Sequence, residues 1–352
     1  MRCPEGHVGA RLDNIRQFLS EIRSGDRENF AAVVDFSYQH YALGDALTTQ
    51  INASCLAREA GCKAIDLFLV ADPAHPAART QSFINNENYA VHLDRLFAAF
   101  LCLPEVRSVR ILRDPNSAGL IWTWIAASRK PHWPSLRDHL RRRMPYPMGH
   151  DTINRFYARE GHIPQLAAPR GYGAWAQRFL REHWPDRFIV CMNPRQSRLT
   201  AMPATTYRDS PLEEWHAFIE ETGARYPEVQ FLMLGGFQEW ESTLPRHPNI
   251  AIPRACGLSL AHELALLRHA DLFMGASSGF ATMATFTDVP YVITDIEGYF
   301  AAWAGVEPGA ESYPFAHARQ HLVWEKETAA LLLGYFESIY SGSRARAAGA
   351  AT

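Results

Sequence analysis

The chain has 352 residues, which is enough for two domains, and its 47% hydrophobic and 20% charged residues are typical of a globular protein. This composition excludes a disordered chain and a fibrous repeat. The formal net charge of -2 lacks the basic excess that general nucleic-acid binding requires, so we expect no nucleic-acid partner.

Cysteine spacing and hydropathy narrow the class further. The six cysteines are scattered without close pairs, which fits neither a zinc ribbon nor a small disulfide scaffold. No stretch reaches the ~20 apolar residues that span a bilayer, and the first 30 residues are rich in charge where a signal peptide would be apolar. We therefore expect a cytoplasmic protein, and peripheral attachment to the inner face of the membrane stays open.

Strand and helix patterns alternate through the first half of the chain. The predicted elements are a helix over 11–24, a strand over 31–36, a helix around 47–55, a strand over 64–70, a helix over 89–103 and a strand over 106–112. This alternation predicts an α/β domain with a parallel sheet, which we assign to residues 1–170. From 115 to 169 the pattern breaks into short pieces among prolines.

A second alternating series predicts a doubly wound domain over residues 171–325. Its elements are a helix over 174–184, a strand over 188–192, a helix over 211–221, a strand over 229–234, a short strand near Ile250, a helix over 259–269, a strand over 271–274, a helix after Ser278 and a strand over 291–293. We predict that a last helix over 326–340 packs back toward the first domain and that the tail 341–352 is disordered.

Loops that follow the predicted strands are the places to look for a site, because open parallel sheets bind ligands beyond the carboxyl ends of their strands. After strand 271–274, small and hydroxyl side chains precede a helix: Ser277, Ser278 and Gly279. Backbone amides at such a helix start could hold a phosphate. The alternative is that Ser277 or Ser278 only caps the helix.

The loop after strand 229–234 contains Gly235 and Gly236, which let a ligand approach the backbone. Glu239 follows, and its carboxylate could accept hydrogen bonds from ribose or sugar hydroxyls. The alternative for Glu239 is a solvated charge in the first turn of a helix, where it offsets the helix dipole.

The loop after strand 188–192 contains Asn193 and Arg195, and Arg208 stands in the next loop. Arginine binds phosphate oxygens in bidentate fashion, so these residues predict contacts to a diphosphate. Arginines in loops are also common on ordinary protein surfaces, and that alternative stays open.

In the first half, Gly44 and Asp45 lie in the turn between strand 31–36 and its helix. The Asp45 carboxylate could take a proton from a hydroxyl that attacks the anomeric carbon of a sugar. Its alternative role is a helix N-cap. Asp35, His40 and His150 are weaker candidates, each of which fits a core, turn or surface position as well.

Two features of the irregular region could serve an acceptor. The basic run Arg141–Arg143, with Arg142 at its centre, could attract an anionic acceptor or a membrane surface, or be solvated helix surface. Trp122 and Trp124 could line an apolar groove or pack in the core. The sequence has no Walker loop, Gly-x-Gly-x-x-Gly motif, zinc-spaced His/Glu pair or nucleophile elbow.

Two separated pieces resemble the heptosyltransferase family, which is glycosyltransferase family 9 and has two Rossmann-like domains in the GT-B arrangement. Residues 42–47 (ALGDAL) are similar to the family's amino-terminal Gly-Asp turn, which implies that Asp45 is the catalytic base. Residues 249–293 are similar to the donor-binding stretch. Residues 207–215 resemble a basic residue before a Trp-Pro and a later Trp, which implies that Arg208 contacts donor phosphate. In this last match Ser210 replaces the first tryptophan.

The resemblance implies an inverting transfer of a sugar from a nucleotide sugar to a glycan, glycolipid or other hydroxyl acceptor, in cell-surface polysaccharide synthesis. No cofactor or metal ion is expected, and the acceptor would lie near Gly44, Arg142 and His150. Ser277 stands where the family often has an aspartate, so ADP-, GDP-, UDP- and dTDP-sugars remain open as donors. The alternatives are a nucleotide-sugar epimerase or hydrolase of the same fold, and a non-catalytic sugar- or nucleotide-binding protein.

Overall fold

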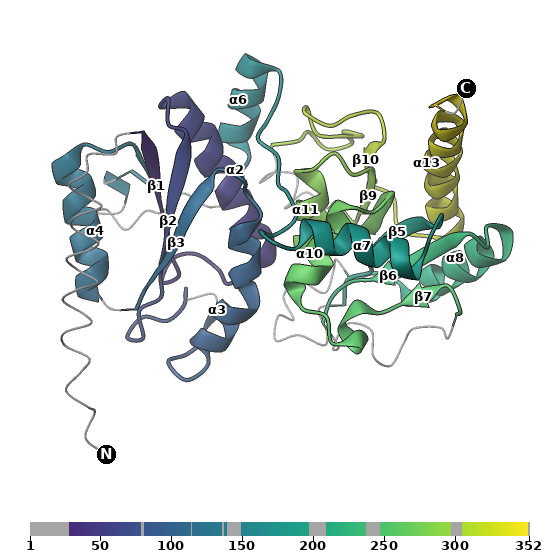
Figure 1. The fold of residues 1–352 in the computed structure, drawn as a ribbon, viewed down its shortest axis with the longest axis horizontal. Helices are drawn as coiled ribbons and strands as arrows, with labels where there is room; N and C mark the ends of the chain where they lie inside the picture. Colours follow the sequence, from purple (N-terminus) through teal and green to yellow (C-terminus); the bar gives the residue numbers. More distant parts are fainter. Residues whose placement is uncertain are drawn as a thin grey trace.

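Two parallel sheets, each covered by helices on both faces, lie side by side in the computed structural model (Figure 1). The structure describes residues 28–78, 81–113, 115–135, 137–138, 149–196, 209–236, 247–296 and 305–350. The helix expected over 11–24 lies outside these residues.

The first sheet has the strand order β3-β2-β1-β4 in the described residues, and all its neighbouring strands are parallel. Its strands are β1 (Asn29–Asp35), β2 (Ala64–Val70), β3 (Val106–Leu112) and β4 (His132–Trp133). Its helices are α2 (Leu43–Glu59), α3 (Tyr89–Phe97) with the 3-10 turn η2 (Ala98–Leu101), α4 (Pro115–Ser128) and α6 (Asp151–Glu160). The strand order reverses between β1 and β4.

The second sheet has the order β7-β6-β5-β8-β9-β10, again parallel throughout the described residues. Its strands are β5 (Phe188–Asn193), β6 (Val229–Met233), β7 (Ile250–Ala251), β8 (Leu272–Ala276), β9 (Tyr291–Thr294) and β10 (Gln320–Leu322). Its helices are α7 (Gly173–His183), α8 (Leu212–Arg225), the 3-10 turn η5 (Pro253–Cys256), α10 (Leu260–Arg268), α11 (Gly279–Thr285) and α13 (Ala329–Ala350). This is the strand order of a doubly wound dinucleotide-binding fold. The predicted α/β class is confirmed.

The inner strands β1, β2 and β5 are mostly apolar and buried, which explains why both faces of each sheet are covered. Successive side chains of a strand point to opposite faces. In β1, Phe30 and Val34 join the core on the α2 side, whereas Ala31 and Val33 pack with α4 on the other. A strand that is buried on both faces therefore reads as a continuous apolar run instead of an alternating one.

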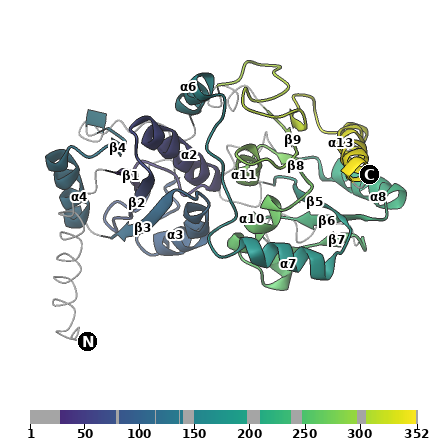
Figure 2. The ribbon, with the colours of Figure 1, turned by 45° about the horizontal axis from the view of Figure 1, so that its top comes forward.

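One hydrophobic core runs across both domains. It joins the α2 face of the first sheet to the face of the second sheet that α10 and α11 cover. Helix α2 packs on α11, and η2 packs on α10. Both views place these helices between the two sheets, with α4 at one end of the molecule and α8 and α13 at the other (Figures 1 and 2).

The C-terminal helix corrects two predictions. Helix α13 packs on α8, on the face of the second sheet away from the first domain, and it continues to Ala350 through the predicted disordered tail. Its apolar side chains Phe336 and Tyr340 pack against Phe188 of β5, and Phe336 also contacts Phe218 of α8. This aromatic contact gives the helix a partner within its own domain. Strands β4 and β10 were not predicted either.

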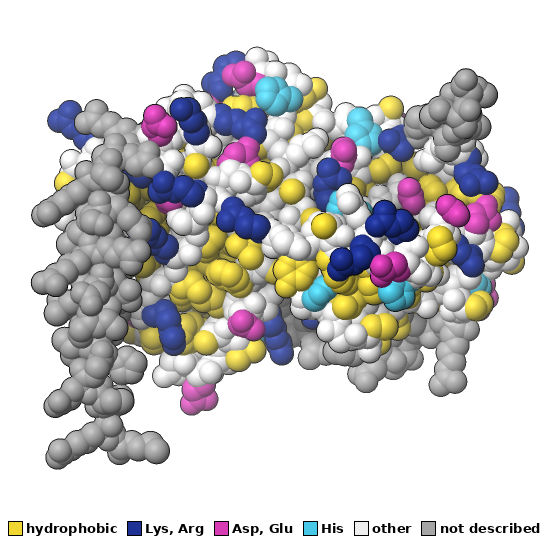
Figure 3. Space-filling model, in the orientation of Figure 1, with side chains coloured by type: hydrophobic (Ala, Val, Ile, Leu, Met, Phe, Trp, Pro, Cys, Tyr) yellow, Lys and Arg dark blue, Asp and Glu magenta, His cyan; other side chains and the backbone are white. Residues whose placement is uncertain are grey.

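The surface in Figure 3 carries a mixed pattern of charge. Lys and Arg side chains are scattered over both domains among acidic ones, and hydrophobic side chains gather near α3. Exposed apolar residues in this part of the chain include Phe83 and Val91. Among the described residues, no helix combines the length and the hydropathy needed to cross a bilayer.

We predict that Phe336→Ala destabilises the second domain by about 3–5 kcal/mol, because a fully buried ring on α13 is lost and a cavity remains. Ser338→Ala, at an exposed position of the same helix, should change the free energy of unfolding by less than about 0.5 kcal/mol. Urea unfolding followed by circular dichroism measures both. Equal stabilities of the two variants would contradict the assigned packing of α13.

Candidate functional site

Both sheets reverse their strand order once, and the loops at these two reversals are where doubly wound folds bind ligands. In the second domain the reversal lies between β5 and β8, so it is flanked by the loops after Asn193 and after Ala276. In the first domain it lies between β1 and β4, beside the segment 36–42 that leads into α2. The two reversals define the candidate site.

A close contact between α2 and α11 joins the two reversals. A Cβ atom on Gly279 would lie 2.5 Å from Cβ of Leu43, and one on Gly44 would lie 3.0 Å from Oγ1 of Thr282. A side chain at position 279 would overlap Leu43, and one at position 44 would require Thr282 to move. Gly44 and Gly279, predicted as ligand-binding residues, therefore have a packing role that sets the spacing of the two domains at the site.

Asp45 lies in the first turn of α2, beside this contact. Its helix is capped by Ala42 without a side-chain hydrogen bond, so Asp45 is not the N-cap. The residue is 3% exposed, and its Oδ2 lies 3.5 Å from Nδ1 of His40, with no closer hydrogen-bond partner among the described residues. Burial raises the pKa of the Asp45 carboxyl, and the nearby His40 opposes that rise.

The segment that carries His40 is anchored on both sides. The Asp35 carboxylate accepts hydrogen bonds from the backbone N–H and the hydroxyl of Ser37, at 3.0 and 2.6 Å. Beyond His40, the backbone N–H of Tyr41 donates to Gln81 at 2.8 Å. The position of His40 relative to Asp45 is thus fixed by the fold of its own loop.

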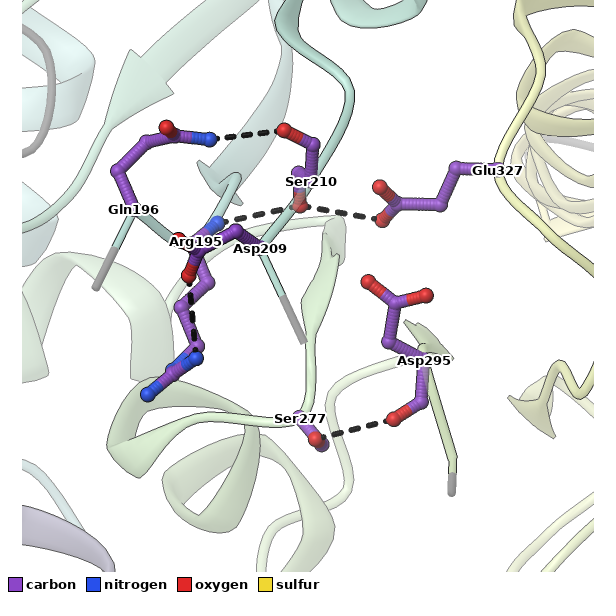
Figure 4. A network of polar contacts seen from close by, with 7 residues as sticks. All are labelled: Arg195, Gln196, Asp209, Ser210, Ser277, Asp295 and Glu327. Atoms are coloured by element: carbon purple, nitrogen blue, oxygen red, sulfur yellow. Dashed lines mark hydrogen bonds and ion pairs between the residues drawn. The ribbon is translucent and has the colours of Figure 1, made fainter. Parts of the chain in front are cut away.

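On the second domain, a polar network surrounds the loop after β5 (Figure 4). Nη1 of Arg195 lies 3.2 Å from Oδ1 of Asp209. The backbone N–H of Arg195 and the side chain of Gln196 both bond to Ser210, and the Ser210 hydroxyl donates to Glu327 at 3.3 Å. The loop is therefore held to the segment before α8 and to the segment before α13.

Glu327 is a buried acid that no sequence signal indicated. Its Oε1 accepts hydrogen bonds from the hydroxyls of Ser210 and Thr294, and the residue is 1% exposed. Burial raises the pKa of the Glu327 carboxyl, and the hydrogen bond from Thr294 opposes that rise. Figure 4 shows the Asp295 carboxylate on the side of the network that carries Glu327, while the carbonyl of Asp295 accepts the hydrogen bond from Ser277.

The two serines of the loop after β8 have different places. Ser277 is fully buried, where its N–H and hydroxyl donate to the carbonyls of Thr294 and Asp295 at 3.0 and 3.2 Å. It ties β8 to β9 and presents no surface to a ligand. Ser278 is the N-cap of α11, since its Oγ accepts a hydrogen bond from the N–H of Ala281 at 3.3 Å. The capping alternative therefore holds for Ser278.

Two backbone N–H groups at the start of α11 are not used by its cap. The N–H groups of Gly279 and Phe280 have no acceptor among the described residues. Unpaired amides at a helix start favour a negatively charged partner.

The predicted residues at the ends of β5 and β6 hold the sheet edge together. The side-chain amide of Asn193 donates to the carbonyl of Leu234 at 2.8 Å. The N–H of Gly235 donates to Glu263 at 3.0 Å, and Arg254 donates to the other oxygen of that carboxylate at 2.7 Å. Glu263 was missed, although a charge on the buried side of the helix predicted over 259–269 is itself a signal.

Three of the predicted residues, Arg142, Arg208 and Glu239, lie outside the described residues. Gly236 has open space where a Cβ atom would lie, so the approach of a ligand there stays a prediction. Among the described residues, no group of three or more His, Cys, Asp or Glu could hold a metal ion.

His150 lies away from these loops, in an aromatic cluster between α6 and the second domain. Its ring centroid is 5.3 Å from Phe286 and 5.4 Å from Tyr313. Burial lowers the pKa of His150 to about 4. The ring serves as a packing element between domains, and this position does not favour its predicted contact with an acceptor.

The fold matches solved glycosyltransferases over most of their length. A glycosyl transferase family 9 structure from Veillonella parvula aligns with TM-score 0.53 and 11% identity, over 88% of this chain and 96% of that chain. The ADP-heptose LPS heptosyltransferase II of E. coli aligns with TM-score 0.52 and 12% identity, over 90% and 99%. The chain has the fold of these glycosyltransferases. No protein-family model and no curated protein sequence matches it.

The heptosyltransferase fold was predicted from residues 42–47 and 249–293, and the expected two-domain GT-B arrangement is confirmed. In the structure these two pieces contain the α2 and α11 starts that contact each other. At 11–12% identity the likeness is one of fold, which does not by itself fix a reaction.

We predict that Gly279→Ala separates the starts of α2 and α11 and destabilises the protein by about 1–3 kcal/mol, because the new Cβ overlaps Leu43. Adding Leu43→Gly, which removes the overlapping atom, should recover part of the loss in a double-mutant cycle. Gly334→Ala, whose Cβ would meet open space, is the matched control and should not destabilise. Strict additivity of the two substitutions would contradict the contact.

A second prediction concerns acid stability. The folded state holds His150 neutral with a pKa of about 4, whereas the unfolded chain protonates it near 6.5. Above pH 6.5 both states hold His150 neutral, so the free energy of unfolding is not reduced. As the pH falls toward 4, the unfolded chain alone takes up the proton, and the free energy of unfolding decreases by roughly 3 kcal/mol. His150→Phe should remove this slope from the free energy of unfolding between pH 7 and 4, and the exposed His75→Gln should keep it. Identical slopes in all three proteins would refute the assignment.

Proposed function

We propose that the protein is an inverting glycosyltransferase that moves a sugar from a nucleoside-diphosphate sugar to a hydroxyl of a glycan or glycolipid. One observation carries this proposal: the buried carboxylate of Asp45 stands at the start of α2, directly beside the contact of Gly44 with the second domain. A proton acceptor from one domain thus adjoins the loops where the other domain would bind a nucleotide.

The second domain supplies groups suited to the leaving diphosphate. The N–H groups of Gly279 and Phe280 start a helix at the strand reversal, and Arg195 follows β5 on the other side of it. Fixed N–H dipoles and a guanidinium group stabilise negative charge as it develops on a departing phosphate. Arg208 and Glu239 remain predicted partners of the phosphate and the ribose.

In the proposed reaction the acceptor oxygen forms a bond to the anomeric carbon as the bond from that carbon to the phosphate oxygen breaks. The electron pair of the broken bond stays on the diphosphate. Attack from the face opposite the leaving group inverts the configuration. The Asp45 carboxylate accepts the hydroxyl proton and becomes a carboxylic acid. A carboxyl whose pKa is raised by burial is a better proton acceptor near neutral pH than an ordinary one.

The acceptor class is proposed from the compared proteins. One of them is an ADP-heptose LPS heptosyltransferase, and we extend an acceptor of this kind, a glycolipid, to this chain. A role in cell-surface polysaccharide synthesis, at the cytoplasmic face of the membrane, follows for this chain as part of the same proposal, with the acceptor approaching from the first domain.

A thermal-shift screen against nucleoside diphosphates tests donor binding, because a ligand that binds only the folded protein raises its melting temperature. Incubation of the responding nucleotide sugar without acceptor then separates the reaction classes. If the nucleoside diphosphate is released only when a hydroxyl acceptor is added, the result supports transfer of the sugar. A change of the sugar without any acceptor would identify an epimerase, and no response to any nucleotide would contradict the proposed function.

We predict that Asp45→Asn lowers kcat by about 10²–10⁴-fold while the donor Kd stays within a factor of two or so, because the amide cannot draw off a proton. Asp72→Asn is the matched control, since Asp72 is also paired with a histidine of the first domain but that histidine, His75, is exposed. Steady-state kinetics and calorimetry measure the two effects. Full turnover in Asp45→Asn would remove Asp45 from the reaction.

A further inference from the structure

The carboxylate of Asp45 is less accessible than the imidazole beside it. The Asp45 side chain is 4% exposed and its Oδ2 is fully buried, whereas the His40 side chain is 23% exposed. An acceptor hydroxyl would have to displace packed atoms to reach Oδ2. The His40 side chain, in contrast, is partly exposed to solvent.

The ring of His40 presents its Nδ1 atom to the buried acid. Its Nδ1 is the atom that lies 3.5 Å from Oδ2 of Asp45, so Nε2 lies on the opposite side of the ring. A carboxylate beside Nδ1 favours the tautomer in which Nδ1 carries the proton and Nε2 has the lone pair. A base that is oriented by a buried acid is the arrangement found in acyl-transfer triads.

We propose that His40 takes the proton of the acceptor hydroxyl and that Asp45 is its positioning residue. This inference rests on the proposed function and refines its base. As the acceptor oxygen bonds to the anomeric carbon, its proton passes to Nε2 of His40, and the electron pair of the breaking bond leaves with the diphosphate. The resulting imidazolium is stabilised by the Asp45 carboxylate through Nδ1–H, and it later returns the proton to water.

Among the described residues, the ionisable groups that could act on the pair are those of the elements packed against α2. Helix α11, which packs on α2, has none, and neither has η2. Helix α2 itself adds Cys55, Arg58 and Glu59 in its later turns. Three strands that neighbour α2 contribute one group each: Asp35 of β1, Asp66 of β2 and His132 of β4. Helix α6 and the residue before it contribute the rest: His150, Asp151, Arg155, Tyr157, Arg159 and Glu160. Of all these groups, His40 is the one that shifts the pKa of Asp45.

The test compares His40→Ala, Asp45→Asn and the control His75→Ala, which alters an exposed histidine that also pairs with an aspartate in the same domain. Transfer rates are measured against pH with the donor that wild type uses, and donor affinity is measured by calorimetry. His40→Ala should lose about 10²–10⁴-fold in kcat with donor Kd unchanged, and added imidazole should restore part of the rate. His75→Ala should match wild type.

The pH profile separates the two roles. If His40 is the base, the acidic limb of the rate profile disappears in His40→Ala and persists, at a reduced rate, in Asp45→Asn. If Asp45 takes the proton directly, the limb disappears in Asp45→Asn and imidazole does not restore His40→Ala. Either that pattern or full activity of His40→Ala would overturn the inference and leave the proposed function standing. A wild-type protein that binds no nucleotide would overturn both.

Discussion

The close contact between the starts of α2 and α11 is the constraint on which the rest of the site depends. Each domain is a doubly wound sheet whose ligand-binding position is set by its own strand order. Nothing in either sheet alone brings these two positions together. Gly44 and Gly279 do so, because their missing side chains let two helix starts approach to van der Waals distance. A shared hydrophobic core then holds the arrangement from both sides.

Electrostatics follow from that geometry. A helix start carries partial positive charge and unpaired N–H groups, and two such starts meet at this contact. One of them has a carboxylate, Asp45, in its first turn, and the other has two N–H groups, those of Gly279 and Phe280, without an acceptor among the described residues. On both sides of the second sheet's reversal, the buried acids Glu327 and Glu263 hold the loops in place through hydrogen bonds. The charged groups around the site therefore have structural roles, whereas Asp45, at the contact of the two helix starts, has no such hydrogen bond among the described residues.

The sequence predicted the fold well because buried parallel strands leave a strong local signal. Strand β2 has the bounds expected from the apolar run 64–70, and the partly exposed β3 has the bounds expected for a strand over 106–112. Strands β4 and β10 have two and three residues, too few for any periodicity to show. Helix α13 was predicted as a helix but with the wrong partner, because an apolar stripe indicates that a helix face is buried without indicating against what.

The site was predictable where a residue's role depends on its own loop, and not where it depends on distant partners. Asp45 and the serine turn stand out by position alone. The burial of Ser277 depends on bonds to Thr294 and Asp295, and the place of Glu327 depends on Ser210, 117 residues away.

The central claim is that the joined strand reversals form one nucleoside-diphosphate site. A crystal structure of the protein with a nucleoside diphosphate tests it most directly: the account predicts phosphate oxygens within hydrogen-bond distance of the N–H groups of Gly279 and Phe280, and a nucleotide bound elsewhere would contradict it.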